Sequence, residues 1–141
     1  EHMTIDSSGN VGIGFTQPSD SYKLDISGHM HLTGSMIMDS DARIKDNIHI
    51  IPNALKSIDS IHGYTYTRND LADSNQKHVG VIAQEIESVY PELVYENERN
   101  TIKSVNYNGL CGILIQCVKE LKDENAMLKD RIQNIEQILN S

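Results

Sequence analysis

The segment MDSDARIKDNI, residues 38–48, places a hydroxyl and an amine five residues apart, at Ser40 and Lys45. A serine hydroxyl is a weak nucleophile until a nearby base takes its proton. A lysine amine can be that base when desolvation or neighbouring cations keep it neutral. Alternatively, Asp39 or Ser40 caps a helix and Lys45 is an ordinary solvated side chain. The segment by itself leaves both interpretations open.

The spacing of the two side chains constrains the backbone around them. Residues five apart do not share one helix face, so Ser40 must lie just before a helix, with the chain turning back toward Lys45. Apolar residues then recur at a helical period at Ile44, Ile48, Ile51, Leu55 and Ile58. We therefore expect helix over residues 41–60, divided into two pieces by Pro52.

The next part of the chain alternates between strand and helix patterns. Residues 63–68, 78–83 and 101–107 alternate apolar and polar side chains and predict three short strands. Residues 83–94 predict a helix that is interrupted near Pro91. The expected fold class is α+β, with a small three-stranded sheet and helices forming a core over residues 40–107.

Residues 4–39 have a different composition, rich in Gly, Ser, Thr and Asp. The alternation in KLDIS and HLTGSMIM predicts short strands, and we expect a β-rich shaft segment that packs on other chains. The motif GNVGIG lacks the glycine spacing of a dinucleotide site, so its glycines are interpreted as turn and close-packing residues. Residues 1–3, EHM, resemble a cloning remnant.

Residues 108–141 predict one long helix with a heptad seam. The seam residues, spaced alternately by four and three, are Leu114, Val118, Leu121, Asn125, Leu128, Ile132, Ile135 and Leu139. Such a narrow stripe is typical of a coiled coil, although a long helix folded back on its own domain is the alternative.

Charge and side-chain shape within this helix predict how the chains assemble. Glu124 with Lys129, and Arg131 with Glu136, are oppositely charged pairs at g and e positions, which align parallel chains in register. Asn125 at an a position sets register at some cost in stability. Isoleucine at both a and d, as at positions 132 and 135, favours more than two strands. We therefore expect a parallel homotrimer.

Composition excludes several classes of function. The formal net charge of −8 argues against a nucleic-acid or anionic-membrane binder, and no apolar run is long enough to span a bilayer. Cys111 and Cys117 lack metal-ligand spacing and are expected to be buried, reduced thiols. No cofactor is expected. A weak alternative is a metal site at His29 and His31, which fall on one face of a strand and could meet in a trimer.

Three segments together resemble a known family. SDARIKDNI, then HVGVIAQEIESVYPELV, then VNYNGLCGILIQCVKEL leading into a coiled coil, are similar in order and spacing to the peptidase S74 family. Members are the intramolecular chaperone domains of phage tail fibres, tailspikes, endosialidases and neck appendages. The resemblance covers residues 38–125, and residues 4–37 look like the shaft that precedes such domains.

The resemblance implies a function. The domain trimerises, helps three fibre chains fold in register and then cuts itself away, so its client is the rest of its own chain. The precursor would be made in the host cytoplasm, and the released domain would be absent from the mature virion.

The resemblance also assigns site residues. Ser40, Asp41, Arg43 and Lys45 match the family pattern Ser-Asp-x-Arg-x-Lys, in which a Ser–Lys dyad makes a single cut. The implied scissile bond joins Ser40 to Asp41.

Two further residues are candidates for supporting this site. Gln84 and Glu85 lie in an AQE segment that recurs in the family's pattern. The alternative for both is a surface-polar side chain in the first turn of a helix, where Glu85 would favour the helix dipole.

The position of the cut raises a stereochemical difficulty. Attack by the Ser40 hydroxyl on its own carbonyl would close a strained four-membered ring. Attack on the Asp39 carbonyl is easier but would cut before Ser40, and groups from a neighbouring chain are the other solution. Two other readings of the whole chain remain: a fibre tip that is never cut, and the self-cleaving trimerisation domain of a transcription factor, as in myelin regulatory factor.

Overall fold

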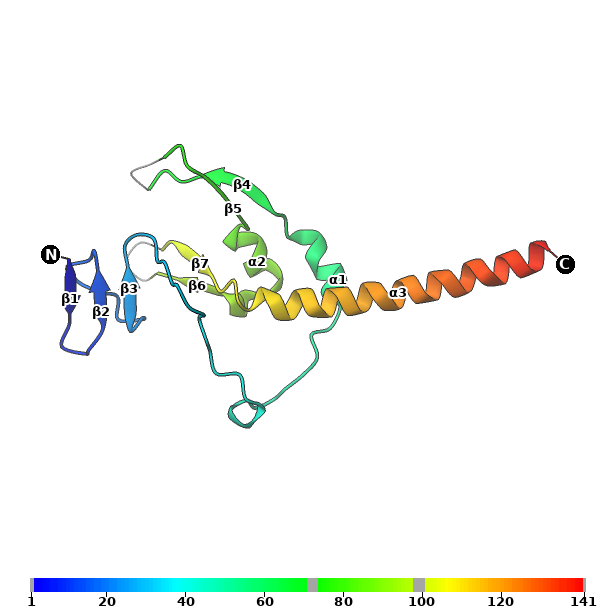
Figure 1. The fold of residues 1–141 in the computed structure, drawn as a ribbon, viewed down its shortest axis with the longest axis horizontal. Helices are drawn as coiled ribbons and strands as arrows, with labels where there is room; N and C mark the ends of the chain where they lie inside the picture. The colour runs from blue at the N-terminus through cyan, green and yellow to red at the C-terminus, as the bar shows by residue number, and fades with distance from the viewer. Residues whose placement is uncertain (1, 71–73, 98–100, 141) are drawn as a thin grey trace. The chain divides into compact units, whose positions relative to one another are not determined.

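The computed structural model describes residues 2–70, 74–97 and 101–140. The chain forms two compact units, residues 1–47 and 48–141, and each is described by itself. The fold is α+β, with small sheets and one long helix, as the sequence predicts (Figure 1).

The first unit contains a three-stranded sheet. Strand β1 (Met3–Ile5) pairs antiparallel with β2 (Val11–Ile13), and β2 pairs parallel with β3 (Leu24–Ile26). Met3, which the sequence suggested excluding from the fold, is thus a strand residue. The turn between β1 and β2 needs glycine at position 9, where φ is 75°. The glycines of GNVGIG accordingly serve turns and close packing, as expected.

Only part of the strand prediction for this unit is confirmed. KLDIS contains β3, but HLTGSMIM forms no strand among the described residues. Its apolar side chains are exposed, and that of Ile37 is 89% exposed. A strand needs a neighbouring strand to satisfy its backbone groups, and none of the described strands pairs with this segment.

The expected helix over residues 41–60 is largely wrong. A single 3₁₀ turn, η1 (Ala42–Ile44), is followed by irregular chain, and then by α1 (Ala54–Ser57) and η2 (Ile58–Ser60). The cap of η1 is Asp41, not Asp39 or Ser40. Asn47 and Asn53 have positive φ, and Pro52 lies between them, so the backbone leaves the helical region where the apolar period alone predicted helix.

The sheet of the second unit also differs from the expectation. Instead of three strands in one sheet, there are two antiparallel pairs: β4 (Tyr64–Thr67) with β5 (Lys77–Gly80), and β6 (Val94–Glu96) with β7 (Lys103–Val105). The sequence pattern missed β6. This strand pairs with β7, which lies within the third predicted strand, residues 101–107. Helix α2 (Ala83–Val89) and the turn η3 (Pro91–Leu93) connect the pairs, close to the predicted helix over residues 83–94.

The core of the second unit forms where α1 and α2 meet the first turns of α3 (Leu110–Leu139) (Figure 1). Its buried members are Ala54, Ile86, Tyr90, Ile113 and Cys117. Cys117 is buried, as predicted, but Cys111 is exposed, because it lies on the opposite face of α3. Within the described ranges, no helix combines the length and apolarity that a membrane crossing requires.

A carboxylate of α3 closes the N-terminus of α1. Asn53 makes no side-chain cap, and the two Glu120 carboxylate oxygens instead accept hydrogen bonds from the backbone N–H groups of Ala54 and Leu55, at 3.2 and 2.8 Å. These bonds satisfy donors that a helix start otherwise leaves unpaired. They hold the pKa of Glu120 below its ordinary value, and the bond from Leu55 contributes most.

Glu120→Gln is expected to lower the midpoint of thermal unfolding at pH 7 by roughly 4 °C or more. The folded pKa is depressed, so the ionised carboxylate stabilises the fold above about pH 4.5, and this contribution is lost as the pH falls through the folded pKa. The difference between wild type and variant should therefore shrink below pH 4.5. Thermal scans from pH 3 to 8 measure it, with Glu92→Gln, an exposed position, as the control. A pH-independent difference would contradict this assignment.

Candidate active site

Ser40 and Lys45 are in direct contact. The Lys45 Nζ donates a hydrogen bond to the Ser40 Oγ at 2.7 Å, and both side chains are exposed. The two residues flank η1, so one tight turn folds the chain back and brings the amine to the hydroxyl, as the sequence predicts. The pair has the geometry for proton transfer between a nucleophile and its base.

Asp41 and Arg43 hold the turn between the two side chains. The Asp41 carboxylate accepts a hydrogen bond from the Arg43 backbone N–H at 2.8 Å. It also binds the Arg43 guanidinium through both oxygens, from Nε at 3.0 Å and Nη2 at 2.7 Å. The guanidinium lowers the pKa of Asp41, and the carboxylate raises that of Arg43. In the described structure Arg43 thus contacts Asp41 and supports the turn between Ser40 and Lys45.

Glu85 is anchored within the second unit. Its carboxylate accepts hydrogen bonds from the Tyr64 hydroxyl at 2.6 Å and the His62 backbone N–H at 2.9 Å. The Tyr64 hydroxyl is the largest cause of the lowered pKa of Glu85, and this carboxylate in turn raises the pKa of Tyr64. These bonds tie the start of β4 to the first turn of α2, a link that the sequence gives no signal for.

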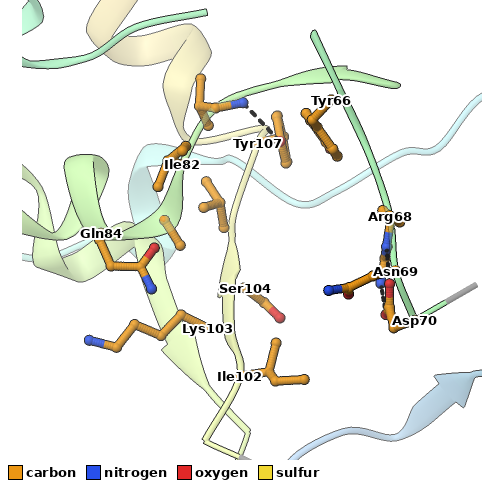
Figure 2. Close-up of a pocket in the computed structure, with 13 residues that line it drawn as sticks. Tyr66, Arg68, Asn69, Asp70, Ile82, Gln84, Ile102, Lys103, Ser104 and Tyr107 are labelled. Atoms are coloured by element: carbon orange, nitrogen blue, oxygen red, sulfur yellow. Dashed lines mark hydrogen bonds and ion pairs between the residues drawn. The ribbon is translucent and has the colours of Figure 1, made fainter. Parts of the chain in front are cut away.

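Gln84 is exposed and lines a groove of about 570 Å³ (Figure 2). The groove lies between the ends of β4 and β7, with Tyr66 and Arg68 on one side and Ile102 and Ser104 on the other. Two of its lining residues are joined directly: the Tyr107 hydroxyl accepts a hydrogen bond from the backbone N–H of Val81 at 3.3 Å. Glycine at position 80 leaves room for the Tyr107 side chain, because a Cβ there would lie 2.5 Å from the Tyr107 hydroxyl.

The sequence-predicted site residues therefore fall into two groups. Ser40, Asp41, Arg43 and Lys45 are joined by hydrogen bonds in the first unit, whereas Gln84 and Glu85 belong to the second unit. The structure brings together the dyad and its turn, and it leaves the supporting roles of Gln84 and Glu85 as predictions.

No metal cluster is present among the described residues, because no three His, Cys, Asp or Glu side chains lie close enough together to hold an ion. The site suggested for His29 and His31 needs several chains and stays a prediction.

The predicted seam lies on one exposed face of α3. Leu114, Val118, Leu121, Asn125, Leu128, Ile132, Ile135 and Leu139 are all exposed. Ile113 and Cys117 lie on an adjacent face of the same turns and are buried against α1 and α2. Cys111, one heptad before Val118, extends the seam toward the helix start. Within the described residues, the single chain thus buries one face of α3 and leaves the seam residues exposed.

Comparison with known proteins gives two kinds of match. Residues 40–95 match the model of the peptidase S74 family, described as the chaperone of endosialidase. The chain is also 31% identical over 107 residues to the long tail fiber protein Gp37 of Salmonella phage S16, covering 71% of this chain and 14% of that protein.

Similar proteins from two other phages are 34% and 29% identical. The long tail fiber protein Gp37 of Escherichia phage AR1 matches over 87 residues, covering 57% of this chain and 8% of that protein. That of Enterobacteria phage T2 matches over 98 residues, covering 66% and 7%. The chain thus spans about a seventh or less of the length of these curated relatives.

Proposed function

Because residues 40–95 belong to the peptidase S74 family, the chaperone of endosialidase, we propose that this chain carries the self-releasing chaperone of a phage tail fibre precursor. The hydrogen bond between Lys45 and Ser40 is the observation that carries the self-releasing part. The relatives named as long tail fibre proteins support the fibre as its client.

The chaperone role rests on assembly into a parallel homotrimer through α3. An apolar seam sustained over almost four heptads and left exposed on one helix face is stabilised when it packs against equivalent helices. Because the seam fixes which residue faces which, it sets a common register for three chains. The shaft strands that precede residue 40 then begin to fold side by side, which lowers the entropy cost of their association.

The release step is a single peptide-bond cleavage. Lys45 takes the proton of the Ser40 hydroxyl, and the oxygen attacks a backbone carbonyl carbon. The C–N bond then breaks, Lys45 returns the proton to the leaving amine, and water hydrolyses the resulting ester. For the Ser40–Asp41 bond, the attacking hydroxyl comes from a neighbouring chain, because attack by Ser40 on its own carbonyl requires a four-membered ring.

Cleavage of this kind depends on assembly. The dyad is exposed in the single chain, and a Ser–Lys pair works best where water is excluded and the amine is kept neutral. A neighbouring chain that covers the turn supplies this exclusion, so the cut follows correct trimer formation. The shaft remains in the phage tail appendage and the chaperone leaves it. Loss of the chaperone then traps the fibre kinetically, because the fibre cannot refold by the same route.

A fibre precursor that ends at residue 39 is expected to give little folded trimer compared with the precursor that includes residues 40–141. The Ser40→Ala precursor should still form trimers but remain uncut. Native gels and light scattering measure assembly, and denaturing gels measure the cut in the same samples. Equal yields of folded fibre from the two precursors would contradict the chaperone role, whatever happens to the cut.

A further inference from the structure

An apolar groove of about 220 Å³ lies beside the first turns of α3. Leu110, Ile113 and Leu114 form its α3 wall, and the other lining residues are Ile58, Ile61, His62, Gly63 and Val81. All of these belong to the second unit, and His62 is the one ionisable side chain among the described lining residues. The groove therefore suits an aliphatic side chain.

Ile115 is a large aliphatic residue that is mostly exposed to solvent in the single chain. It is 62% exposed and lies at an e position, between the seam residues Leu114 and Val118 and the polar face of α3. The e positions of the next three heptads hold Lys122, Lys129 and Glu136. The first e position of α3 is therefore apolar, whereas the three e positions that follow it are charged.

The heptad register relates Ile115 to the groove. In a parallel coiled coil, a g residue lies beside the e residue five positions later on the neighbouring helix. This offset joins Glu124 to Lys129 and Arg131 to Glu136, and the same offset joins Leu110 to Ile115. Leu110 lines the groove, so the groove flanks the side of α3 on which a neighbour's e residue arrives.

We propose that the groove is the docking site for Ile115 of a second copy of this chain, three times around the parallel trimer. The inference rests on the proposed trimer and adds a specific contact to it. Ile113 belongs both to the groove and to the buried core, so the contact joins the coiled coil to the core of the adjacent chaperone domain. Trimerisation would then stabilise the α+β core as well as the helix.

Cross-linking tests this contact directly. A small diazirine-bearing aliphatic residue is placed at position 115 in the chain of residues 1–141, and chains labelled with nitrogen-15 are mixed with unlabelled ones. Illumination should join position 115 to peptides of the other label that contain residues 58–63 or 110–114. The same probe at Met127, which is exposed at a c position, should give no such products.

A substitution gives an independent readout. Ile115→Asp is expected to raise the concentration at which half of the chains assemble by roughly tenfold or more, because it removes apolar burial and places a charge in the groove. Met127→Asp should leave that concentration unchanged.

The outcomes separate the two proposals. If wild type is a monomer at all concentrations tested, the proposed trimer fails and this inference fails with it. If wild type is a trimer, but position 115 cross-links elsewhere or Ile115→Asp assembles like wild type, the docking site is overturned and the trimer stands.

Discussion

Leu128→Asp is expected to convert the assembled protein into single chains, whereas Met127→Asp is expected to leave assembly intact. The two residues are adjacent on α3 and similarly exposed in the single chain, at 52% and 59%. Leu128 is a d residue of the predicted seam, and Met127 is a c residue outside it. Full burial of a leucine contributes about 1.5–3 kcal/mol, and aspartate would instead bring three charges together at the axis.

Light scattering coupled to size-exclusion chromatography measures the result. A single chain of 15.8 kDa and its trimer differ threefold in mass, so the two outcomes are well separated. Circular dichroism of both variants controls for the loss of helix. If the two variants behave alike, the residues of the seam have no special role, and α3 does not form the predicted coiled coil.

Ser40→Ala and Lys45→Met are each expected to slow release of the chaperone by at least about a thousandfold, because members of a nucleophile–base pair act as a unit. The experiment uses the whole fibre precursor, since the shaft is part of the substrate. Ser35→Ala and Lys56→Met change an exposed serine and an exposed lysine elsewhere and should leave the rate unchanged. Both dyad variants should still form trimers, which separates chemistry from assembly.

Intact-mass spectrometry of the wild-type products also identifies the bond. A cut between Ser40 and Asp41 leaves Ser40 on the shaft fragment, and a cut between Asp39 and Ser40 leaves it on the chaperone fragment. The second result would mean that the hydroxyl attacks the preceding carbonyl within its own chain. An uncut wild-type precursor that still forms trimers would instead favour the alternative of a structural fibre tip, and release by Ser40→Ala would exclude the dyad.

The features that sequence alone determined are those set by residues close together in the chain. The heptad spacing from Leu114 to Leu139 predicted one helix over residues 108–141, and α3 spans Leu110–Leu139, because a helix is built from contacts three and four residues apart. The meeting of Ser40 and Lys45 was predicted for a similar reason, since one turn with its own Asp41–Arg43 bonds suffices to form it.

The features that only the tertiary structure decided depend on partners far away in the chain. Glu120 caps α1 from a position more than 60 residues distant, and neither end of this contact carries a local signal. Glu85 receives its hydrogen bonds from Tyr64 and His62 in the same way.

The strands show the same division between local and distant interactions. In the second unit, the alternation of apolar and polar residues predicted three strand segments but not which strands pair. One three-stranded sheet was predicted, whereas the structure has two antiparallel pairs. A strand is completed only by the strand it pairs with, and competing pairings differ in contacts that no short stretch of sequence contains. Local periodicity therefore specified α3 and several of the strand segments, but it was wrong over residues 41–60 and missed β6. The packing of distant residues decided these segments and which strands meet.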